Sequence, residues 1–100
     1  MATVIVRYKV ESGRGDENTD LVKAVFAELK ETKPNGVRYA TFVADDGLSF
    51  THVASVDEGV ENPIPQMDAF KVFQQGLRER CEEKPTPTPV REVGSYNFFD

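Results

Sequence analysis

The chain has a single histidine, His52, and of its side chains this one is the best suited to acid–base chemistry. Imidazole can accept and donate a proton near neutral pH without a large change in its pKa. His52 lies in the middle of a run of strand-forming residues, as do Tyr8, Tyr39 and Tyr96 in their own runs. A phenol hydroxyl near His52 could donate a hydrogen bond to a developing enolate oxygen. These residue types predict a catalytic site with His52 as general base and Tyr8 as the group that stabilises the oxyanion.

The same residues also have purely structural interpretations. A lone histidine on a central strand can be hydrogen-bonded within the sheet or at an interface, and tyrosine suits half-buried strands. Arg7 and Arg38 each precede a tyrosine and therefore point to the opposite face of the strand, where they would be rim charges or pair with a carboxylate. The sequence does not reveal the register between strands, so it leaves open whether His52, Tyr8 and Arg38 share a face.

Other chemistries have less support. Cys81 is the only cysteine, so it cannot form an internal disulfide or a multi-thiolate metal site, and the adjacent Glu82 and Glu83 should raise its thiol pKa. The acidic residues at positions 45, 46, 57 and 58 lack the spacing of a calcium loop, and no glycine-rich phosphate loop is present. We therefore expect no metal, flavin or nucleotide cofactor.

Length and charge restrict the class of protein. One hundred residues of 11.2 kDa predict a single domain, residues 1–100. The net charge of −5 argues against nucleic acid and against anionic membranes as partners. The apolar run within residues 1–10 contains Arg7 and Lys9 and is too short for a signal peptide or a membrane span, so we expect a cytoplasmic location.

Hydrophobic periodicity predicts the elements of the first half. A strand over 3–10 is followed by a polar loop over 11–18, in which Asp16, Asn18 or Thr19 could cap a helix. The helix extends to about Lys33, since its apolar residues recur at helical spacing and Pro34-Asn35-Gly36 then ends it. Strands over 37–44 and 48–56 flank an Asp-Gly hairpin signal at 45–47.

The second half predicts one helix and one strand. The helix carries a stripe formed by Met67, Phe70, Phe73, Leu77 and Cys81. Residues 84–89, with three prolines, predict a stiff extended spacer, and residues 90–99 predict the fourth strand. The resulting order, β-α-β-β-α-β, is typical of a ferredoxin-like α+β fold, in which two helices cover one face of a four-stranded antiparallel sheet.

The strands carry apolar residues on both faces. In the first strand Val4, Val6, Tyr8 and Val10 alternate with Ile5, and in the second strand Val37, Tyr39 and Val43 alternate with Ala40 and Phe42. Two helices on one side cannot cover both faces, so we expect the second face to pack against another copy of the chain. We expect the fourth strand to lie against, or cross to, this partner, because the spacer would hold the strand away from its helix.

At this level the chain resembles the dimeric α+β-barrel proteins of the antibiotic-biosynthesis-monooxygenase type. The resemblance rests on the order and spacing of five segments, Val6-Arg7-Tyr8-Lys9-Val10, Gly36-Val37-Arg38-Tyr39, Asp45-Asp46-Gly47, Val56-Asp57-Glu58 and Asp68-Ala69-Phe70-Lys71-Val72-Phe73. It implies a homodimer in which two sheets pack face to face into a barrel, with the helices outside.

The resemblance also implies a range of chemistries. Members carry out cofactor-independent oxygenation of aromatic polyketides, haem breakdown, polyketide cyclisation, and muconolactone-type isomerisation or decarboxylation. This chain has no tryptophan, and Val56 stands at the third-strand position where many members carry one. The combination of Trp, His and Asn that haem-degrading members use therefore cannot be assembled here.

Two classes of function remain. The chain could be a cofactor-independent monooxygenase or cyclase that acts on a small aromatic or polyketide-like compound, or a non-enzymatic ligand-binding or self-assembling protein. The enzyme requires a cavity of at least about 300 Å³ within reach of His52. The alternative predicts that bulky side chains fill that space, and Phe26, Met67, Phe70 and Phe73 are the candidates.

Overall fold

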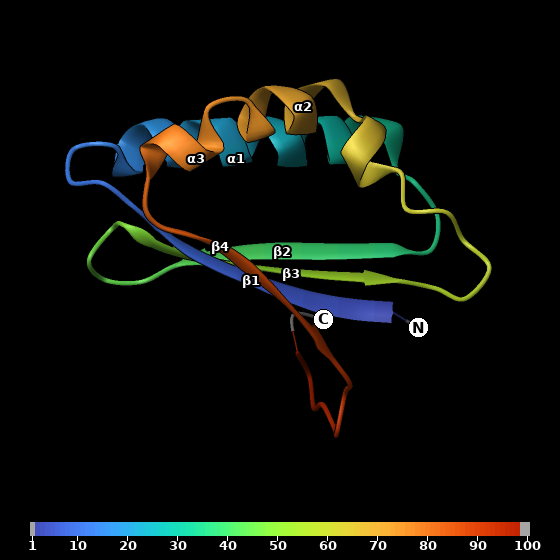
Figure 1. Ribbon diagram of the computed structural model, residues 1–100. Coiled ribbons are helices and arrows are strands. Elements are labelled where there is room, and N and C mark those ends of the chain that lie inside the picture. Colours follow the sequence, from blue (N-terminus) through green and yellow to red (C-terminus); the bar gives the residue numbers. More distant parts are fainter. Residues whose placement is uncertain (1, 99–100) are drawn as a thin grey trace.

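The computed structural model describes residues 2–98, which form a four-stranded antiparallel sheet covered by helices on one face (Figure 1). The elements are β1 (Ala2–Val10), α1 (Gly15–Thr32), β2 (Val37–Val43), β3 (Ser49–Val56), a 3₁₀ turn η1 (Ile64–Gln66), α2 (Asp68–Gln74), α3 (Leu77–Arg80) and β4 (Cys81–Val90). The strand order is β2-β3-β1-β4, with every neighbouring pair antiparallel. This confirms the predicted ferredoxin-like α+β fold.

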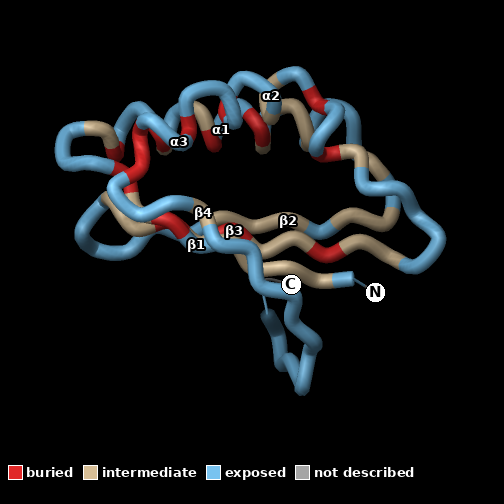
Figure 2. The backbone as a smooth tube through the Cα atoms, in the orientation of Figure 1, coloured by how far each residue is buried: buried red, intermediate tan, exposed pale blue. Residues whose placement is uncertain are grey.

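The strand register puts the two predicted sets of apolar side chains on opposite faces of the sheet. Val6 lies opposite His52 and Tyr8 opposite Phe50 on β1 and β3, and Thr41 of β2 lies on the other side of His52. These side chains share the face beneath the helices, where the buried positions concentrate (Figure 2). His52 is therefore central in the sheet, as its place in the strand pattern predicted, and its ring lies 5.5 Å from that of Phe73 in α2.

Helix α1 begins earlier than predicted. Residues 15–18 are helical rather than loop, Arg14 occupies the cap position, and Asn18 lies inside the helix with no exposed surface. Asn18 thus does not cap the helix. Gly15 allows the early start, because a Cβ there would collide with the carbonyl oxygen of Gly47 in the hairpin between β2 and β3.

The predicted second helix is interrupted. Helix α2 ends at Gln74, Gly76 adopts a left-handed conformation with φ of 77°, and the single turn α3 follows. Cys81 is then the first residue of β4 rather than the end of a helical stripe. The break turns Arg80 inward, where only 2 % of its surface is exposed.

The prediction for the fourth strand is wrong. Strand β4 comprises Cys81–Val90 and includes the proline-rich segment that composition indicates as a spacer, whereas residues 91–98 form neither helix nor strand and Phe99 lies outside the described residues. Proline occupies every second position of β4 from Pro85 to Pro89. The three positions that lack an N–H donor therefore lie on the same side of the strand. Because β4 is an edge strand, that side can be the free edge, and the ladder with β1 keeps its donors at Thr86 and Thr88.

The second face of the sheet carries no layer of its own among residues 2–98 (Figure 1). Ile5, Val53 and Ala40 form a row across its three adjacent strands, with Phe42 beside them. The segment after β4 extends away from the sheet on this side, and its Val93 and Tyr96 are 97 % and 88 % exposed. Within the described chain, no helix is both long and apolar enough to cross a membrane.

Candidate functional site

A cavity of about 380 Å³ lies between the sheet and helix α2, and its wall includes His52, Tyr8 and Tyr39. Most of the remaining wall is apolar, contributed by the strands, η1 and the helices: Val4, Val6, Ala54, Ile64, Phe70, Phe73 and Leu77. Phe70 and Phe73 thus form part of the wall without filling the space, while Phe26 stacks on Tyr39 with ring centroids 5.2 Å apart. The cavity exceeds the volume of about 300 Å³ that a ligand site requires.

Both ring nitrogens of His52 are hydrogen-bonded. Nε2 lies 2.7 Å from the hydroxyl of Tyr8, and Nδ1 lies 2.7 Å from the hydroxyl of Tyr39 and 3.0 Å from that of Thr41. The ring of Tyr8 also stacks against the His52 ring, with centroids 5.3 Å apart. The structure therefore brings together the two residues predicted as catalytic, His52 and Tyr8, although a ligand would meet the ring nitrogens through tyrosine hydroxyls.

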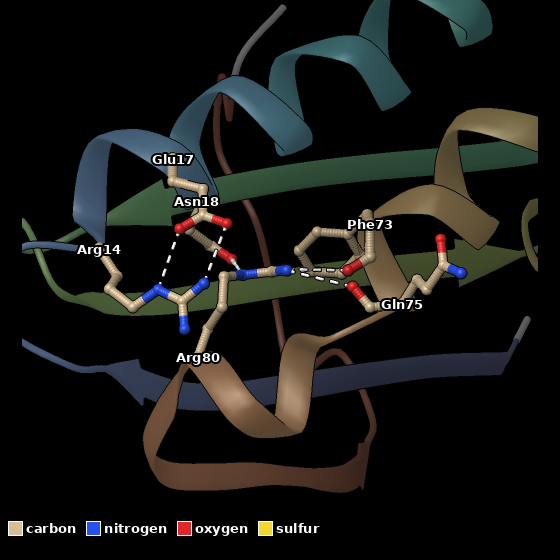
Figure 3. A network of polar contacts seen from close by, with 6 residues as sticks. All are labelled: Arg14, Glu17, Asn18, Phe73, Gln75 and Arg80. Atoms are coloured by element: carbon tan, nitrogen blue, oxygen red, sulfur yellow. Dashed lines mark hydrogen bonds and ion pairs between the residues drawn. The ribbon is translucent and has the colours of Figure 1, made fainter.

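The hydrogen-bond chain continues beyond Tyr8 into helix α1. Asn18 donates from Nδ2 to the Tyr8 hydroxyl at 2.9 Å, and Arg80 donates from Nε to Asn18 Oδ1 at 3.2 Å. Figure 3 shows Arg80 reaching from α3 to Asn18 at one end and to the backbone near Phe73 at the other. Five side chains, Arg80, Asn18, Tyr8, His52 and Tyr39, are thus joined in one buried chain.

Arg80 has no carboxylate partner among the ion pairs of residues 2–98. Its guanidinium donates to the carbonyl oxygens of Phe73 at 2.8 Å and Gln75 at 3.3 Å, and it lies 5.7 Å from the centroid of the Phe73 ring. The nearby Arg14 forms an ion pair with Glu17 on the surface. All hydrogen-bond acceptors of the buried Arg80 guanidinium are thus neutral, and its charge acts at longer range on the Glu17 carboxylate and, more weakly than burial, on Tyr8.

Burial controls the protonation of the site. Removal from water lowers the pKa of His52 to about 4, so the imidazole is neutral at pH 7. Burial raises the pKa of Tyr39 to about 12, which a side-chain hydrogen bond with Thr41 opposes, and it raises the pKa of Tyr8 well above its ordinary value. At neutral pH the cavity thus presents a neutral imidazole and protonated phenols.

The lowered pKa of His52 predicts a loss of stability in mild acid. Below pH 6.5 the unfolded chain binds a proton at His52 that the folded protein does not bind until about pH 4. Stability from this residue is therefore complete above pH 6.5 and decreases by up to about 3 kcal/mol as the pH falls to 4. We expect denaturant titrations across this range to show a smaller pH dependence for His52→Gln than for wild type. Parallel curves for the two proteins would contradict the assignment.

The structure separates the other predicted candidates from this site. Arg38 lies on the open face and pairs with Asp57 at 2.8 Å, so it does not share the cavity with His52 and Tyr8. Tyr96 lies in the segment after β4 and is 88 % exposed. Cys81 is buried, and its thiol pKa is raised as predicted, but the main cause is burial rather than the adjacent Glu82 and Glu83.

The predicted site did not include Asn18, Arg80 or Thr41. A signal for two of them existed, because Asn18 lies four residues before Val22 on the buried stripe of α1, and Arg80 follows Leu77 by three positions. A polar residue on an apolar stripe is unusual and indicates a buried partner. Thr41 gives no such signal, since threonine is ordinary in a strand.

The described residues contain no cluster of three or more His, Cys, Asp or Glu side chains that could hold a metal ion. The polar groups of the cavity wall are instead a neutral imidazole and hydroxyl groups, together with Asn62, Gln74 and Arg78. Such an arrangement can bind an oxygen-bearing organic molecule and exchange protons with it.

No family model and no curated protein matches this sequence. Solved structures do match over nearly the whole chain. Rv0793 from Mycobacterium tuberculosis is 13% identical and covers 94% of this chain and 96% of its own, with a TM-score of 0.72. A structure described as an antibiotic biosynthesis monooxygenase is 13% identical and covers 94% of this chain and 100% of its own, with a TM-score of 0.67.

A further match is a mutant form of SnoaB, a cofactor-independent oxygenase from Streptomyces nogalater. It is 15% identical and covers 97% of each chain, with a TM-score of 0.69. The resemblance that the sequence motifs predicted is thereby confirmed at the level of the fold, which this chain shares with antibiotic biosynthesis monooxygenase structures. Identities this low carry no residue roles from those proteins to this one.

Proposed function

We propose that the cavity binds a small, largely apolar, enolisable or phenolic compound, and that the protein removes a proton from it without a metal or flavin. The observation that carries this proposal is the His52 imidazole, hydrogen-bonded to two tyrosines in the wall of a mostly apolar cavity of about 380 Å³. A site of this size and composition suits a compound of one to three fused rings with few polar groups.

The proton path follows from the contacts. Both ring nitrogens of His52 are already bonded to side chains, so the ligand proton moves to a tyrosine oxygen while that tyrosine passes its own proton to the imidazole. In the ligand-free protein the buried imidazole of His52, with a pKa of about 4, is a weak base at neutral pH. An enolate formed beside the ring would raise the imidazole pKa, because opposite charges in a dry site stabilise each other.

The overall reaction that we propose is the oxygenation of an activated methylene group. Loss of one proton leaves an enolate, which transfers an electron to dioxygen and combines with the resulting superoxide to form a carbon–oxygen bond. The peroxide takes up a proton, and loss of water from the hydroperoxide leaves a carbonyl, so that R₂CH₂ and O₂ become R₂CO and H₂O. SnoaB, which has the same fold, is described as a cofactor-independent oxygenase, and this supports oxygenation over other fates of an enolate.

Cyclisation would use the same first step, with the enolate carbon attacking a carbonyl of the same molecule. A protein that only binds the compound would show neither reaction. The three functions are distinguished by their products, since oxygenation consumes one O₂ per molecule of ligand, cyclisation consumes none, and binding leaves the compound unchanged.

Filling the cavity should abolish binding. Ala54 lies on β3 in the cavity wall, and replacing it by phenylalanine occupies the ligand's volume. We expect Ala54→Phe to weaken binding of an enolisable aromatic ketone such as anthrone at least about tenfold, as measured by calorimetry. Ala27→Phe, on the exposed face of α1, makes the same change outside the cavity and should bind like wild type. Equal binding by the two variants would refute the ligand site.

We also propose that the protein is a homodimer joined through the open face of the sheet. Ile5, Ala40, Phe42 and Val53 place an apolar surface there that no helix of the described chain covers, and Val93 and Tyr96 extend on the same side. Two such faces packed together would give the dimeric barrel, and the segment over 91–98 would lie against the partner. Pro85, Pro87 and Pro89 favour face-to-face packing, because they deprive the β4 edge of donors for strand pairing.

A further inference from the structure

Arg80 gives the buried hydrogen-bond chain a direction. A guanidinium can only donate hydrogen bonds, and Arg80 donates to Oδ1 of Asn18, as Figure 3 shows. The amide of Asn18 must therefore point its nitrogen the other way, and Nδ2 donates to the Tyr8 hydroxyl at 2.9 Å. The Tyr8 oxygen is thus an acceptor.

The next two links follow from the chemistry of phenol and imidazole. With its oxygen accepting from Asn18, Tyr8 has its own proton free to donate to His52 Nε2, 2.7 Å away. A neutral imidazole that accepts at Nε2 carries its proton on Nδ1. Nδ1–H then donates between the oxygens of Tyr39 at 2.7 Å and Thr41 at 3.0 Å.

Tyr39 is the last member of the chain. Its oxygen accepts from His52, and its hydroxyl also has a side-chain hydrogen bond with Thr41, which contacts the same ring nitrogen. Tyr39 also lines the cavity. The Tyr39 hydroxyl proton can therefore turn from the Thr41 oxygen to an acceptor oxygen of a bound molecule.

We propose that Arg80, acting through Asn18, sets the polar end of the cavity as a hydrogen-bond donor at Tyr39, and so selects ligands that present an acceptor oxygen, such as aromatic ketones and their enolates. The proposal rests on the proposed function in taking the cavity as the ligand site. It divides the roles of the two tyrosines, with Tyr8 and His52 Nε2 forming the path for the proton and Tyr39 holding the ligand oxygen. Arg80 and Asn18 are positioning residues, since neither reaches the ligand.

A near-isosteric substitution should reverse the chain. In Asn18→Asp the carboxylate accepts from Arg80 and from Tyr8, so the Tyr8 proton turns toward α1 and its oxygen becomes an acceptor for His52 Nε2–H. Nδ1 then accepts from Tyr39, whose proton leaves the cavity. The polar end of the cavity becomes an acceptor.

The imidazole of the ligand-free protein reports this directly. Nitrogen NMR distinguishes the protonated from the unprotonated ring nitrogen, and we expect the proton on Nδ1 in wild type and on Nε2 in Asn18→Asp. Wild type protonated on Nε2, or an Asn18→Asp protein that keeps the Nδ1–H form, would overturn the proposal.

Two probes of similar size test the consequence for ligands. 1-Indanone has only an acceptor oxygen and indole only a donor N–H. Wild type should bind 1-indanone about 3- to 10-fold more tightly than indole, the range expected for one hydrogen bond, and Asn18→Asp should reverse the order. Equal binding of the two probes to wild type would overturn the selection. If neither probe binds, the cavity is not the ligand site and the proposed function fails. The NMR experiment needs no ligand, so it tests the direction of the hydrogen-bond chain separately.

Changes at Arg80 provide a second route if Asn18→Asp does not fold. Glutamine can donate or accept, so Arg80→Gln should populate both imidazole tautomers. Lysine can only donate, so Arg80→Lys should restore the Nδ1–H form. A merely structural role for Arg80 would affect stability in both variants and the tautomer in neither, and that result would overturn the proposal.

Discussion

Replacing His52 by alanine is expected to lower turnover of an enolisable aromatic ketone about 100- to 10,000-fold, the usual contribution of a positioned general base. The substitution removes the acceptor at the end of the proton path, since Tyr8 contacts Nε2 at 2.7 Å and no second histidine exists in the chain. Oxygen consumption measured with an electrode, together with mass analysis of the product, checks the result.

The control must separate chemistry from folding, because His52 is only 5 % exposed and its removal leaves two tyrosine hydroxyls without their partner. Val22→Ala removes buried contacts of α1 away from the cavity wall and so lowers stability without touching the site. It should retain turnover in proportion to its folded fraction. His52→Gln keeps hydrogen-bonding capacity but cannot take up a proton, so it should be as inactive as His52→Ala. A wild type that turns over the ketone while His52→Ala does so at the same rate would eliminate His52 as the base.

Replacing Phe42 by aspartate is expected to convert a dimer into a monomer of 11.2 kDa. Phe42 lies on the open face of β2 with 39 % of its surface exposed, so a carboxylate there would be desolvated between two packed sheets. The dimer dissociation constant should rise about 30-fold or more, as for an interface hot spot, and light scattering across a concentration series measures it.

The adjacent residue supplies a matched control. Val43 is 47 % exposed at the same end of β2 but points to the opposite face, so Val43→Asp should leave the dimer intact. Removal of residues 91–100 should weaken the dimer without unfolding the sheet, since β4 ends at Val90. Wild type that stays at 11.2 kDa at every concentration would refute the interface, and so would equal effects of the two aspartate variants.

Elements whose signals are local could be predicted from the residues alone. Period-two alternation over residues 3–10 and 37–43 predicted which side chains would share a face, and the breakers at 34–36 and 45–47 predicted where the chain would turn. Together these gave the β-α-β-β-α-β order, which the structure confirms. His52 and Tyr8 were identifiable as candidates because their chemistry is evident from residue type alone.

Composition was misleading where the position in the sheet decides the outcome. Three alternating prolines predict a spacer, because proline has no N–H to donate and a strand with neighbours on both sides needs donors on both sides. Strand β4 nevertheless runs through them, since an edge strand needs donors on one side only and Thr86 and Thr88 face β1. The edge position of a strand is a property of the whole sheet, and no local pattern contains it.

The arrangement of the site depends on contacts between segments that are distant in the sequence. The register that sets Thr41 and Val6 on either side of His52 places Tyr8 and Tyr39 at its two nitrogens and Arg38 on the other face. The break at Gly76 then turns Arg80 inward to Asn18, across 62 positions of sequence. Strand register and helix breaks result from packing free energies summed over the whole chain, and for that reason the direction of the hydrogen-bond chain could not be predicted from residue types and spacing.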